Sequence, residues 1–374
     1  MQAMSKHWTT NALLTLLITL HTISTCDSFT FQHAMPSSKL RSNSQHTKTF
    51  ADNTVSRVEA TVDDLPESNE PTPATFQQCI QQAARATEKA IEDGYVLMEV
   101  EFPPLASDFL EDTSSSAYDI SRANVRLSSQ FGNYFAKNGK NVAVLLPDSA
   151  ELEQAVEDEG TDEVFPNVKL ASARKSTQGS AQSLDQLFSG FFGGKSSEME
   201  PIAEAEMYIA IVFSCQELPD LKKLHDLEPD KPIVFFNLKL DTQRGDLGLP
   251  AFPPKSLHYD FLSKVKPTYL LRTRAYSKSL TKPPYIVNYQ GAQFRVYPGH
   301  YQSLLDVGSG RYRQVDKSAA RLPLGDFKEK LTSAMQLNEG ENKVASFFRR
   351  GYKTRTWWED DKSFQLEASK NWRT

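Results

Sequence analysis

Cysteine is scarce in this sequence, which limits the scaffolds that the chain can use. There are three cysteines, and beyond the N-terminal region only Cys79 and Cys215 remain. Two cysteines are too few for a disulfide framework, and their spacing matches no zinc pattern. The part of the chain beyond the N-terminal region also has no Asn-x-Ser/Thr acceptor, which secreted glycoproteins often carry. Both absences count against an extracellular protein.

The histidine and glycine motifs of common enzymes are also missing. Four of the seven histidines precede residue 50, and neither a His-x-x-x-His pair nor a Gly-x-Ser-x-Gly elbow occurs. The segment SGFFGGKSS, residues 189–197, approaches a phosphate-binding loop, but its first glycine is one residue out of register. Gly308 and Gly310 supply half of a dinucleotide fingerprint and predict a turn. We therefore expect no metal site, no cofactor and no catalytic residue.

Long apolar runs and a strong charge bias are absent beyond the N-terminal region. The longest apolar run there covers about eight residues, 208–215, and is too short to span a bilayer. A net charge of -5 gives no general attraction to nucleic acid or to anionic lipid. With 39% hydrophobic and 24% charged residues, the composition is that of a globular protein. We expect a mature protein with no transmembrane segment and no nucleic-acid partner.

The N-terminal region has the composition of a targeting sequence in two parts. Residues 1–28 contain Lys6 and the apolar run 11–20, as a signal peptide does. Residues 29–68 begin at Phe29, and their first part is rich in serine and threonine and contains basic residues but no acid, as a transit peptide does before a linker. Together the two parts resemble the bipartite presequence of algae with secondary plastids, which implies import into the plastid (chloroplast) stroma. The alternative is simple secretion with a linker.

Beyond the presequence, we predict a single α/β domain over residues 69–336. Thr72 and Pro73 are expected as the N-cap and first residue of a helix that stops at Gly94, and a strand follows from Val96 to Phe102. A second helical pattern precedes the buried-strand run NVAVLLPD, and MYIAIVFS and PIVFFN repeat this alternation of strand and helix. Strands separated by helices predict a mostly parallel sheet flanked by helices, of the Rossmann-like, doubly wound kind.

The last third of the chain changes to an antiparallel pattern. Residues 267–276 alternate as a strand does, residues 284–299 predict two strands around a turn at Gln290 and Gly291, and a further hairpin turns at Gly308–Gly310. A closing helix is expected from Leu324 to Met335. Residues 337–374 then form a polar tail with a basic and aromatic cluster.

Two glutamates interrupt the apolar strand 96–102. Alternation along the strand places Glu99 and Glu101 on one face, about 7 Å apart, where they could act as a paired acid and base. Carboxylates at this spacing are also typical of a strand that is half-exposed or lies at the edge of a sheet. The second interpretation is the one that we adopt.

Polar residues at the ends of apolar strands form the candidate ligand site. Asp148, Cys215 and Asn237 follow such strands, and Glu101 lies near the end of the strand 96–102. Open parallel sheets bind ligands outside the carboxyl ends of their strands. Each residue also has a structural alternative. Asp148 could cap a helix, Asn237 could form a turn, and Cys215 could be a buried thiol.

The C-terminal cluster is the candidate partner-binding segment. Aromatic side chains beside arginine are common in binding hot spots and at membrane interfaces. The alternative is a tail that is disordered or that folds back to cover the domain. The candidates are Arg349, Arg350, Tyr352, Trp357 and Trp358.

Four blocks of the sequence, in their order and spacing, resemble an uncharacterised plastid and cyanobacterial domain. The blocks are residues 71–105, the strand ending in LLPD, the run PIVFFNLKL, and residues 294–323. This domain of unknown function occurs in the plant protein Low PSII Accumulation 3 and is appended to some plastid adenylate kinases. Tyr301 stands where the family tends to have tryptophan, and this change keeps an aromatic ring.

The resemblance implies a non-catalytic auxiliary role, in which the protein helps photosystem II to assemble or accumulate at the thylakoid. Its partner would be a photosystem II core subunit or an assembly factor, with peripheral contact to the thylakoid as a further option. No catalytic residue is transferred from the family. The alternative is an enzyme that binds a small molecule or nucleotide at the strand-end site.

Overall fold

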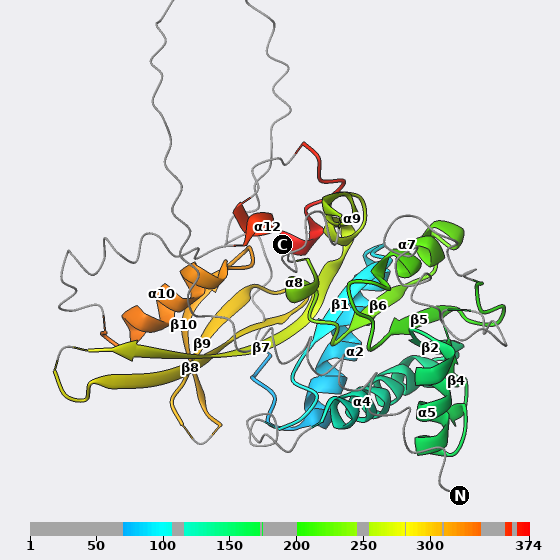
Figure 1. Cartoon of the computed structure of the whole chain (residues 1–374), viewed down its shortest axis with the longest axis horizontal. Coiled ribbons are helices and arrows are strands. Elements are labelled where there is room, and N and C mark those ends of the chain that lie inside the picture. Colours follow the sequence, from blue (N-terminus) through cyan, green and yellow to red (C-terminus); the bar gives the residue numbers. More distant parts are fainter. Residues whose placement is uncertain are drawn as a thin grey trace, which may run out of the picture. The chain divides into compact units, whose positions relative to one another are not determined.

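Ten strands form one mixed sheet in the computed structural model, which describes residues 70–106, 116–172, 174, 200–244, 254–280, 282–308, 310–337, 356–360 and 365–374. The strand order is β10-β9-β8-β7-β1-β6-β5-β2-β4-β3, and neighbouring strands from β7 to β4 run parallel (Figure 1). At the two edges, β3 and the β8–β10 strands pair antiparallel. The predicted fold class is therefore confirmed. The strands are β1 (Leu97–Glu101), β2 (Val142–Leu146), β3 (Glu163–Phe165), β4 (Val168–Ser172), β5 (Met207–Ala210), β6 (Ile233–Phe236), β7 (Lys266–Ser279), β8 (Ile286–Val296), β9 (Tyr301–Asp306) and β10 (Tyr312–Ser318).

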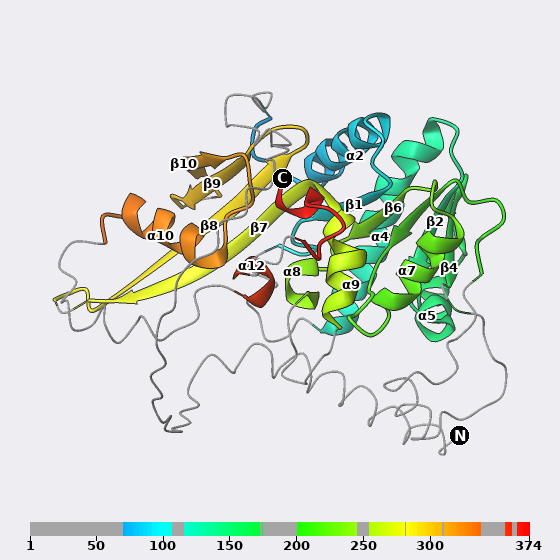
Figure 2. The ribbon, with the colours of Figure 1, turned by 90° about the horizontal axis from the view of Figure 1, so that it is seen from above.

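Helices flank both faces of the parallel part of the sheet (Figure 2). Three of these helices begin with a side-chain cap, because Thr75, Ser116 and Asp148 each accept a hydrogen bond from a backbone N–H of the first turn of the helix that follows. One face is covered by α2 (Phe76–Glu92), α4 (Ala117–Lys137) and α5 (Ser149–Glu159), and the other by α7 (Leu218–Leu227), α8 (Leu240–Gln243), α9 (Lys255–Asp260) and the 3-10 helix η2 (Leu262–Lys264).

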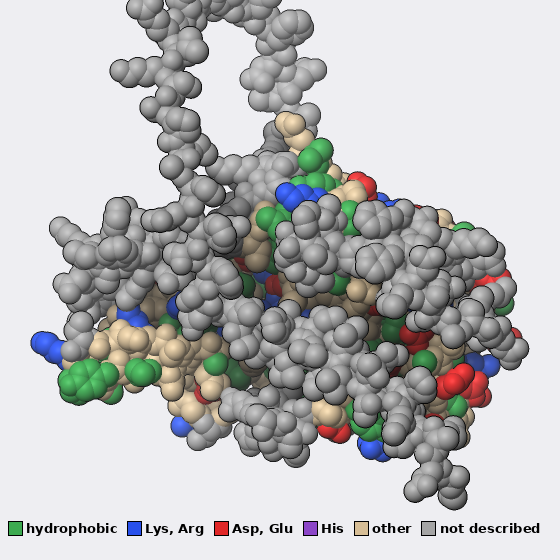
Figure 3. Space-filling view, viewed as in Figure 1, with side chains coloured by type: hydrophobic (Ala, Val, Ile, Leu, Met, Phe, Trp, Pro, Cys, Tyr) green, Lys and Arg blue, Asp and Glu red, His purple; other side chains and the backbone are tan. Residues whose placement is uncertain are grey.

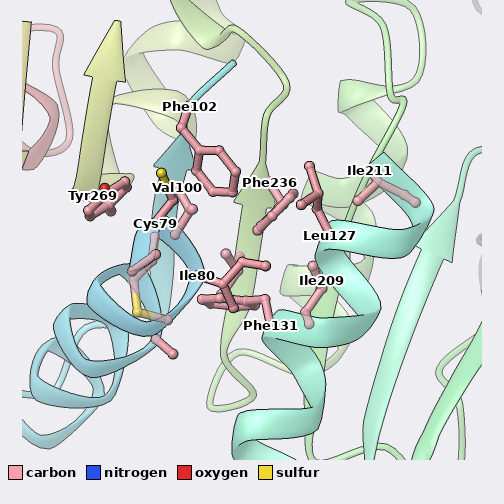
Figure 4. Packing of buried hydrophobic residues seen from close by; sticks show 14 of the residues in the cluster. Cys79, Ile80, Val100, Phe102, Leu127, Phe131, Ile209, Ile211, Phe236 and Tyr269 are labelled. Atoms are coloured by element: carbon pink, nitrogen blue, oxygen red, sulfur yellow. The ribbon is translucent and has the colours of Figure 1, made fainter. Parts of the chain in front are cut away.

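Alternation along the strands divides the hydrophobic core into two layers. Val100 faces the layer of α2 and α4, where Phe102, Phe131 and Phe236 meet with neighbouring ring centroids 5.4 Å apart (Figure 4). Leu97 faces the opposite layer, with α7 and α9. Each fully buried side chain of this size contributes about 1.5–3 kcal/mol to folding. The same alternation places Glu99 and Glu101 in the layer of Leu97.

Strand β7 joins the parallel and antiparallel parts of the sheet. Its first residues pair parallel with β1, and the rest of the strand pairs antiparallel with β8. Helix α10 (Leu324–Ala334) packs on the antiparallel part, where Phe327 and Leu331 meet Tyr289 and Leu305. The predicted closing helix and the hairpin before it are thus confirmed.

Three local expectations are wrong. Gly291 does not turn a hairpin but lies inside the continuous strand β8, where an added Cβ would lie 2.5 Å from the Leu304 carbonyl oxygen and 2.6 Å from Leu331 Cδ1. Glycine here permits close approach of a neighbouring strand and helix. Strand β1 is not at an edge, because β6 and β7 pair with its two sides. The helix expected from Thr72 begins after Thr75, whose side chain supplies the cap.

The C-terminal residues that the structure describes pack against the domain. The Ala368 N–H donates to the Tyr259 carbonyl oxygen (2.8 Å), and the Arg321 N–H donates to that of Arg373 (2.8 Å). This segment contains the short helices α12 (Trp357–Asp360) and η3 (Asn371–Arg373). The proposed presequence and the segment 189–197 lie outside the described residues. No helix within the described ranges has the length and apolarity needed to cross a membrane.

Candidate functional site

The two glutamates of β1 are the centre of a buried cluster of charges. Glu99 is 1% exposed and Glu101 is 7% exposed, so the expected half-exposed face is wrong. Arg272 on β7 binds Glu101 through two donors: its Nε donates to Oε1 at 2.7 Å, and its Nη2 donates to Oε2. Paired donors of this kind are the strongest arrangement that a guanidinium offers to a carboxylate. They tie β1 to β7 where the parallel and antiparallel parts meet.

Three further residues extend the cluster. Arg272 Nη1 also donates to Asp241 on α8, and Arg321 Nη2 lies 2.9 Å from the same carboxylate oxygen. Arg244, directly after α8, donates from Nη1 to Asp241 Oδ1 at 3.2 Å. Arg321 Nη1 is 3.5 Å from Glu99 Oε2. The charge cluster consists of Glu99, Glu101, Asp241, Arg244, Arg272 and Arg321.

Three carboxylates and three guanidinium groups face one another in this buried cluster. Burial opposes ionisation of Glu101, but the attraction and hydrogen bonds of Arg272 lower its pKa below the usual value. Burial lowers the pKa of Arg244 to about 10, which leaves its guanidinium charged at neutral pH. A buried charge is tolerated only when it is paired, so each of these side chains depends on the others.

Aromatic rings of the C-terminal segment cover the cluster. The Arg244 guanidinium lies 5.2 Å from the ring of Trp372 and 5.8 Å from that of Trp358, and the two indoles meet edge to face. His258 on α9 contacts Trp372, and its Nε2 is 3.2 Å from Glu367 Oε1. Burial lowers the pKa of His258, so the neutral ring donates to the Glu367 carboxylate at neutral pH. These contacts hold the C-terminal segment against the charge cluster.

A small pocket of about 100 Å³ opens beside this cover. Arg321 and Arg373 contribute guanidinium groups to its wall, and Trp358 and Trp372 contribute indole rings. Guanidinium and indole groups suit a small anion or a flat ring. Among the described residues, no group of three or more His, Cys, Asp or Glu side chains is arranged to hold a metal ion.

The predicted strand-end residues do not gather around this pocket. Asp148 Oδ1 accepts from the backbone N–H groups of Ala150 and Glu151, as a helix cap does. Asn237 accepts from the Phe102 N–H at 2.8 Å and donates to Asn124 at 3.0 Å, so it connects β1, β6 and α4. Asp148 is thus a helix cap, and Asn237, with φ at 54°, lies in the bend that follows β6, as the structural alternatives expect. Ligand binding at the strand ends stays a prediction.

Cys215 follows β5 as a buried free thiol, and burial raises its pKa above the usual value. A raised pKa disfavours the reactive thiolate. The position therefore fits the structural alternative, in which Cys215 is a small apolar side chain.

Two of the five candidate partner-binding residues lie within the described residues. Trp358 is buried against Trp372 and Arg244, as the fold-back alternative expects. Trp357 is half-buried beside His258 and under the ammonium of Lys255. Arg349, Arg350 and Tyr352 lie outside the described residues. Partner binding by this segment stays a prediction.

The charge cluster and its aromatic cover can be located relative to a known protein family. The family model described as "Domain of unknown function (DUF1995)" matches residues 73–329. The chain belongs to this family. No curated protein and no solved structure matches the chain. All six members of the charge cluster lie inside the DUF1995 domain, whereas its aromatic cover from Trp358 to Trp372 lies beyond it.

Four members of the charge cluster escaped the sequence analysis. Asp241, Arg244, Arg272 and Arg321 stand in no motif, and only Glu99 and Glu101 were noticed. A signal was nevertheless present, because Arg272 and Arg274 alternate along β7 as the two glutamates do along β1. Recognising it requires the parallel pairing of β1 with β7 in the DUF1995 fold, and these strands lie far apart in sequence.

Proposed function

We propose that this protein is a non-catalytic auxiliary factor of the plastid that helps photosystem II to assemble or accumulate at the thylakoid. It acts in the stroma after import through the bipartite presequence, and it binds a photosystem II core subunit or an assembly factor. Membership of the DUF1995 family supports the proposal through the resemblance described above. The composition of residues 1–68 points to the same organelle.

One structural observation carries the non-catalytic part of the proposal. Three of the four candidate side chains at the carboxyl ends of the strands, where this class of fold places its reactive groups, are held by intramolecular contacts. Arg272 holds Glu101, the first turn of α5 holds Asp148, and the Phe102 N–H and Asn124 hold Asn237. Side chains committed in this way support a rigid binding surface better than a reaction.

Affinity capture from detergent-solubilised thylakoids tests the proposal. The tagged chain serves as bait, and the enrichment of photosystem II core subunits is measured relative to photosystem I subunits. Preferential enrichment is expected. Equal recovery of both photosystems, or of neither, would count against the proposal. Depletion of the protein in vivo should reduce newly made photosystem II subunits and leave photosystem I unchanged.

The import step is tested separately. Residues 1–68 fused to a fluorescent protein should direct it into the plastid, and a fusion that lacks residues 29–68 should stop earlier in the secretory route. Secretion of the complete fusion would support the alternative interpretation of the leader.

The pocket beside Arg321 favours a second candidate function, the binding of a small anionic metabolite or nucleotide. A thermal-shift panel of nucleotides and sugar phosphates tests this candidate. A ligand present at about 100 times its dissociation constant adds about 2.7 kcal/mol of stability. Arg373→Met should abolish a shift that arises in the pocket, and Asn237→Ala should abolish one that arises at the strand ends.

A further inference from the structure

Strands β7 and β8 continue beyond the sheet as a two-stranded ribbon. β9 pairs with β8 only from Gly291 to Phe294, whereas β7 and β8 stay paired as far as Ser279 and Ile286. Toward the end of the ribbon, Gly291, which faces Arg274, is the last residue of β8 that pairs with β9. At about 3.3 Å per residue, the following residues of β7, Ala275–Ser279, extend about 16 Å beyond that point. The ribbon ends at the left in Figure 1 and carries a group of hydrophobic side chains at that end in Figure 3.

Helix α10 supports one face of this ribbon. Tyr276 and Tyr289 lie opposite each other on the two strands, with ring centroids 5.6 Å apart, and Phe327 of α10 packs against Tyr276. The Tyr289 hydroxyl is 2.8 Å from the hydroxyl of Thr332, also on α10. A two-stranded hairpin alone is marginally stable in water, so the contacts of α10 with Tyr276 and Tyr289 stabilise the ribbon below its tip.

The tip carries the two most exposed large apolar side chains among the described residues. Tyr285 is 64% exposed and Ile286 is 63% exposed, and they follow Pro283 and Pro284. Prolines have no N–H, and the Leu280 N–H already donates to the Tyr285 carbonyl oxygen at 2.7 Å. Among the described residues of the tip, Pro283 and Pro284 thus have no backbone donor and that of Leu280 is already bonded, which lowers the cost of leaving water.

The ribbon is basic in a chain that is acidic overall. Between Phe261 and Leu305 there is no Asp or Glu, although the whole chain has a net charge of -5. The outer part of the ribbon carries Lys278, whose ammonium donates to the Leu337 carbonyl oxygen, and Lys282, which is exposed beside the apolar tip. This local excess of positive charge complements an anionic surface.

We propose that the tip of the ribbon, residues 280 and 282–286, inserts into a lipid surface that carries anionic headgroups. Tyr285 would lie at the level of the headgroups, where tyrosine side chains collect in membrane proteins, and Ile286 would reach the acyl chains. Lys282 would extend its ammonium to the lipid phosphates. A protein groove would favour exposed backbone donors for strand pairing, whereas the two prolines of this tip have none. The inference rests on the proposed function for the identity of the membrane, but its test does not require a photosystem.

A local fluorescent probe on the full chain tests the proposal, because the apolar run 11–20 could bind vesicles by itself. Ile286→Cys in a Cys26→Ser background is labelled with a polarity-sensitive dye, since Cys79 and Cys215 are buried. Leu227→Cys, on α7, is the matched control because Leu227 is 57% exposed. Vesicles of phosphatidylcholine are compared with vesicles in which phosphatidylglycerol replaces a third of the lipid.

The expected result is a blue shift of the dye at position 286 with the anionic vesicles and no shift at position 227. Lys282→Gln should lower the affinity for anionic vesicles, read from the lipid concentration that gives half of the dye shift, about five-fold. This is the effect of removing one basic charge near an anionic membrane. No shift at 286, an equal shift at 227, or an equal shift with neutral vesicles would overturn the proposal.

The same variants separate this inference from the proposed function. If photosystem II subunits are captured but the tip does not respond to lipid, the proposed function stands and the lipid site is refuted. If Ile286→Ser abolishes that capture while the probe never responds to vesicles, the tip is a docking site for protein instead. A lipid response without any capture would refute only the photosystem role.

Discussion

Replacing Arg272 by methionine should destabilise the domain severely. The guanidinium of Arg272 contacts Glu101 and Asp241 directly, and it lies 3.9 Å from Glu99. Methionine fills a similar volume but provides no charge. The three carboxylates would then face only Arg244 and Arg321, and Glu101 would lose both of its charged hydrogen bonds.

Removing one partner of a buried ion pair costs about 3–5 kcal/mol, and typical domains are stable by about 5–15 kcal/mol. Arg272→Met should therefore remove about a fifth or more of the stability at neutral pH. Urea unfolding followed by tryptophan fluorescence measures this change, because Trp358 and Trp372 lie against Arg244 of the same cluster. The double variant Glu101→Leu/Arg272→Met should lose less than the sum of the single variants, because it restores the balance of charge.

Arg126→Met provides the matched control. Arg126 Nε lies 2.9 Å from Glu159 Oε1, a distance like those in the cluster, but the Arg126 side chain is 50% exposed. An exposed pair of this kind contributes about 0.2–1 kcal/mol. Equal losses for Arg272→Met and Arg126→Met, or losses in the double variant that simply add, would refute the view that the cluster is one interdependent unit.

Two other perturbations probe separate parts of the fold. Gly291→Ala should cost about 1–3 kcal/mol in a urea titration, because its Cβ would meet the Leu304 carbonyl oxygen at 2.5 Å, whereas Gly132→Ala, whose nearest contact is a side-chain methyl group at 3.1 Å, should cost less; equal costs would contradict the close approach. Stability should also fall as the pH drops below about 6.5, because burial holds the folded pKa of His258 below that unfolded value, so the unfolded chain takes up the proton first. His258→Gln should reduce the pH dependence of the urea midpoint between about pH 7 and about pH 5, with a part left to His225, whose pKa burial also lowers; an unchanged slope would contradict the assignment.

The parallel half of the sheet could be predicted because its strands carry their own signal. Buried parallel strands form short continuous apolar runs, and NVAVLLPD, MYIAIVFS and PIVFFN are such runs. Each run precedes or follows a helix with one apolar face, so the alternation predicts the class of fold. The structural alternatives for Asp148 and Asn237 could be stated for a similar reason, since helix caps and turns depend on neighbouring residues.

The charge cluster could not be predicted because it is assembled from distant parts of the chain. Glu101 and Arg272 are 171 residues apart in sequence, and Arg321 lies in a loop before α10. A glutamate in an apolar strand is far more often exposed than buried, so local reasoning placed β1 at an edge. The turn predicted at Gly291 was wrong for a related reason. A glycine between two alternating runs is typical of a turn, and only the position of Leu331 on α10 shows why the strand continues through it.

A rigid joint at β7 is what would make the ribbon useful as an anchor. The inner half of β7 is fixed by pairing with β1 and by the contacts of Arg272, and the outer half is fixed by α10 through Tyr276. A tip held at both levels loses little conformational entropy when it enters a bilayer, so more of the binding free energy of Tyr285 and Ile286 is retained. The buried charges of the DUF1995 domain then contribute to lipid binding by the tip, because they hold the strand that carries it. Arg272→Met should therefore weaken the lipid response of the tip even where the domain remains folded.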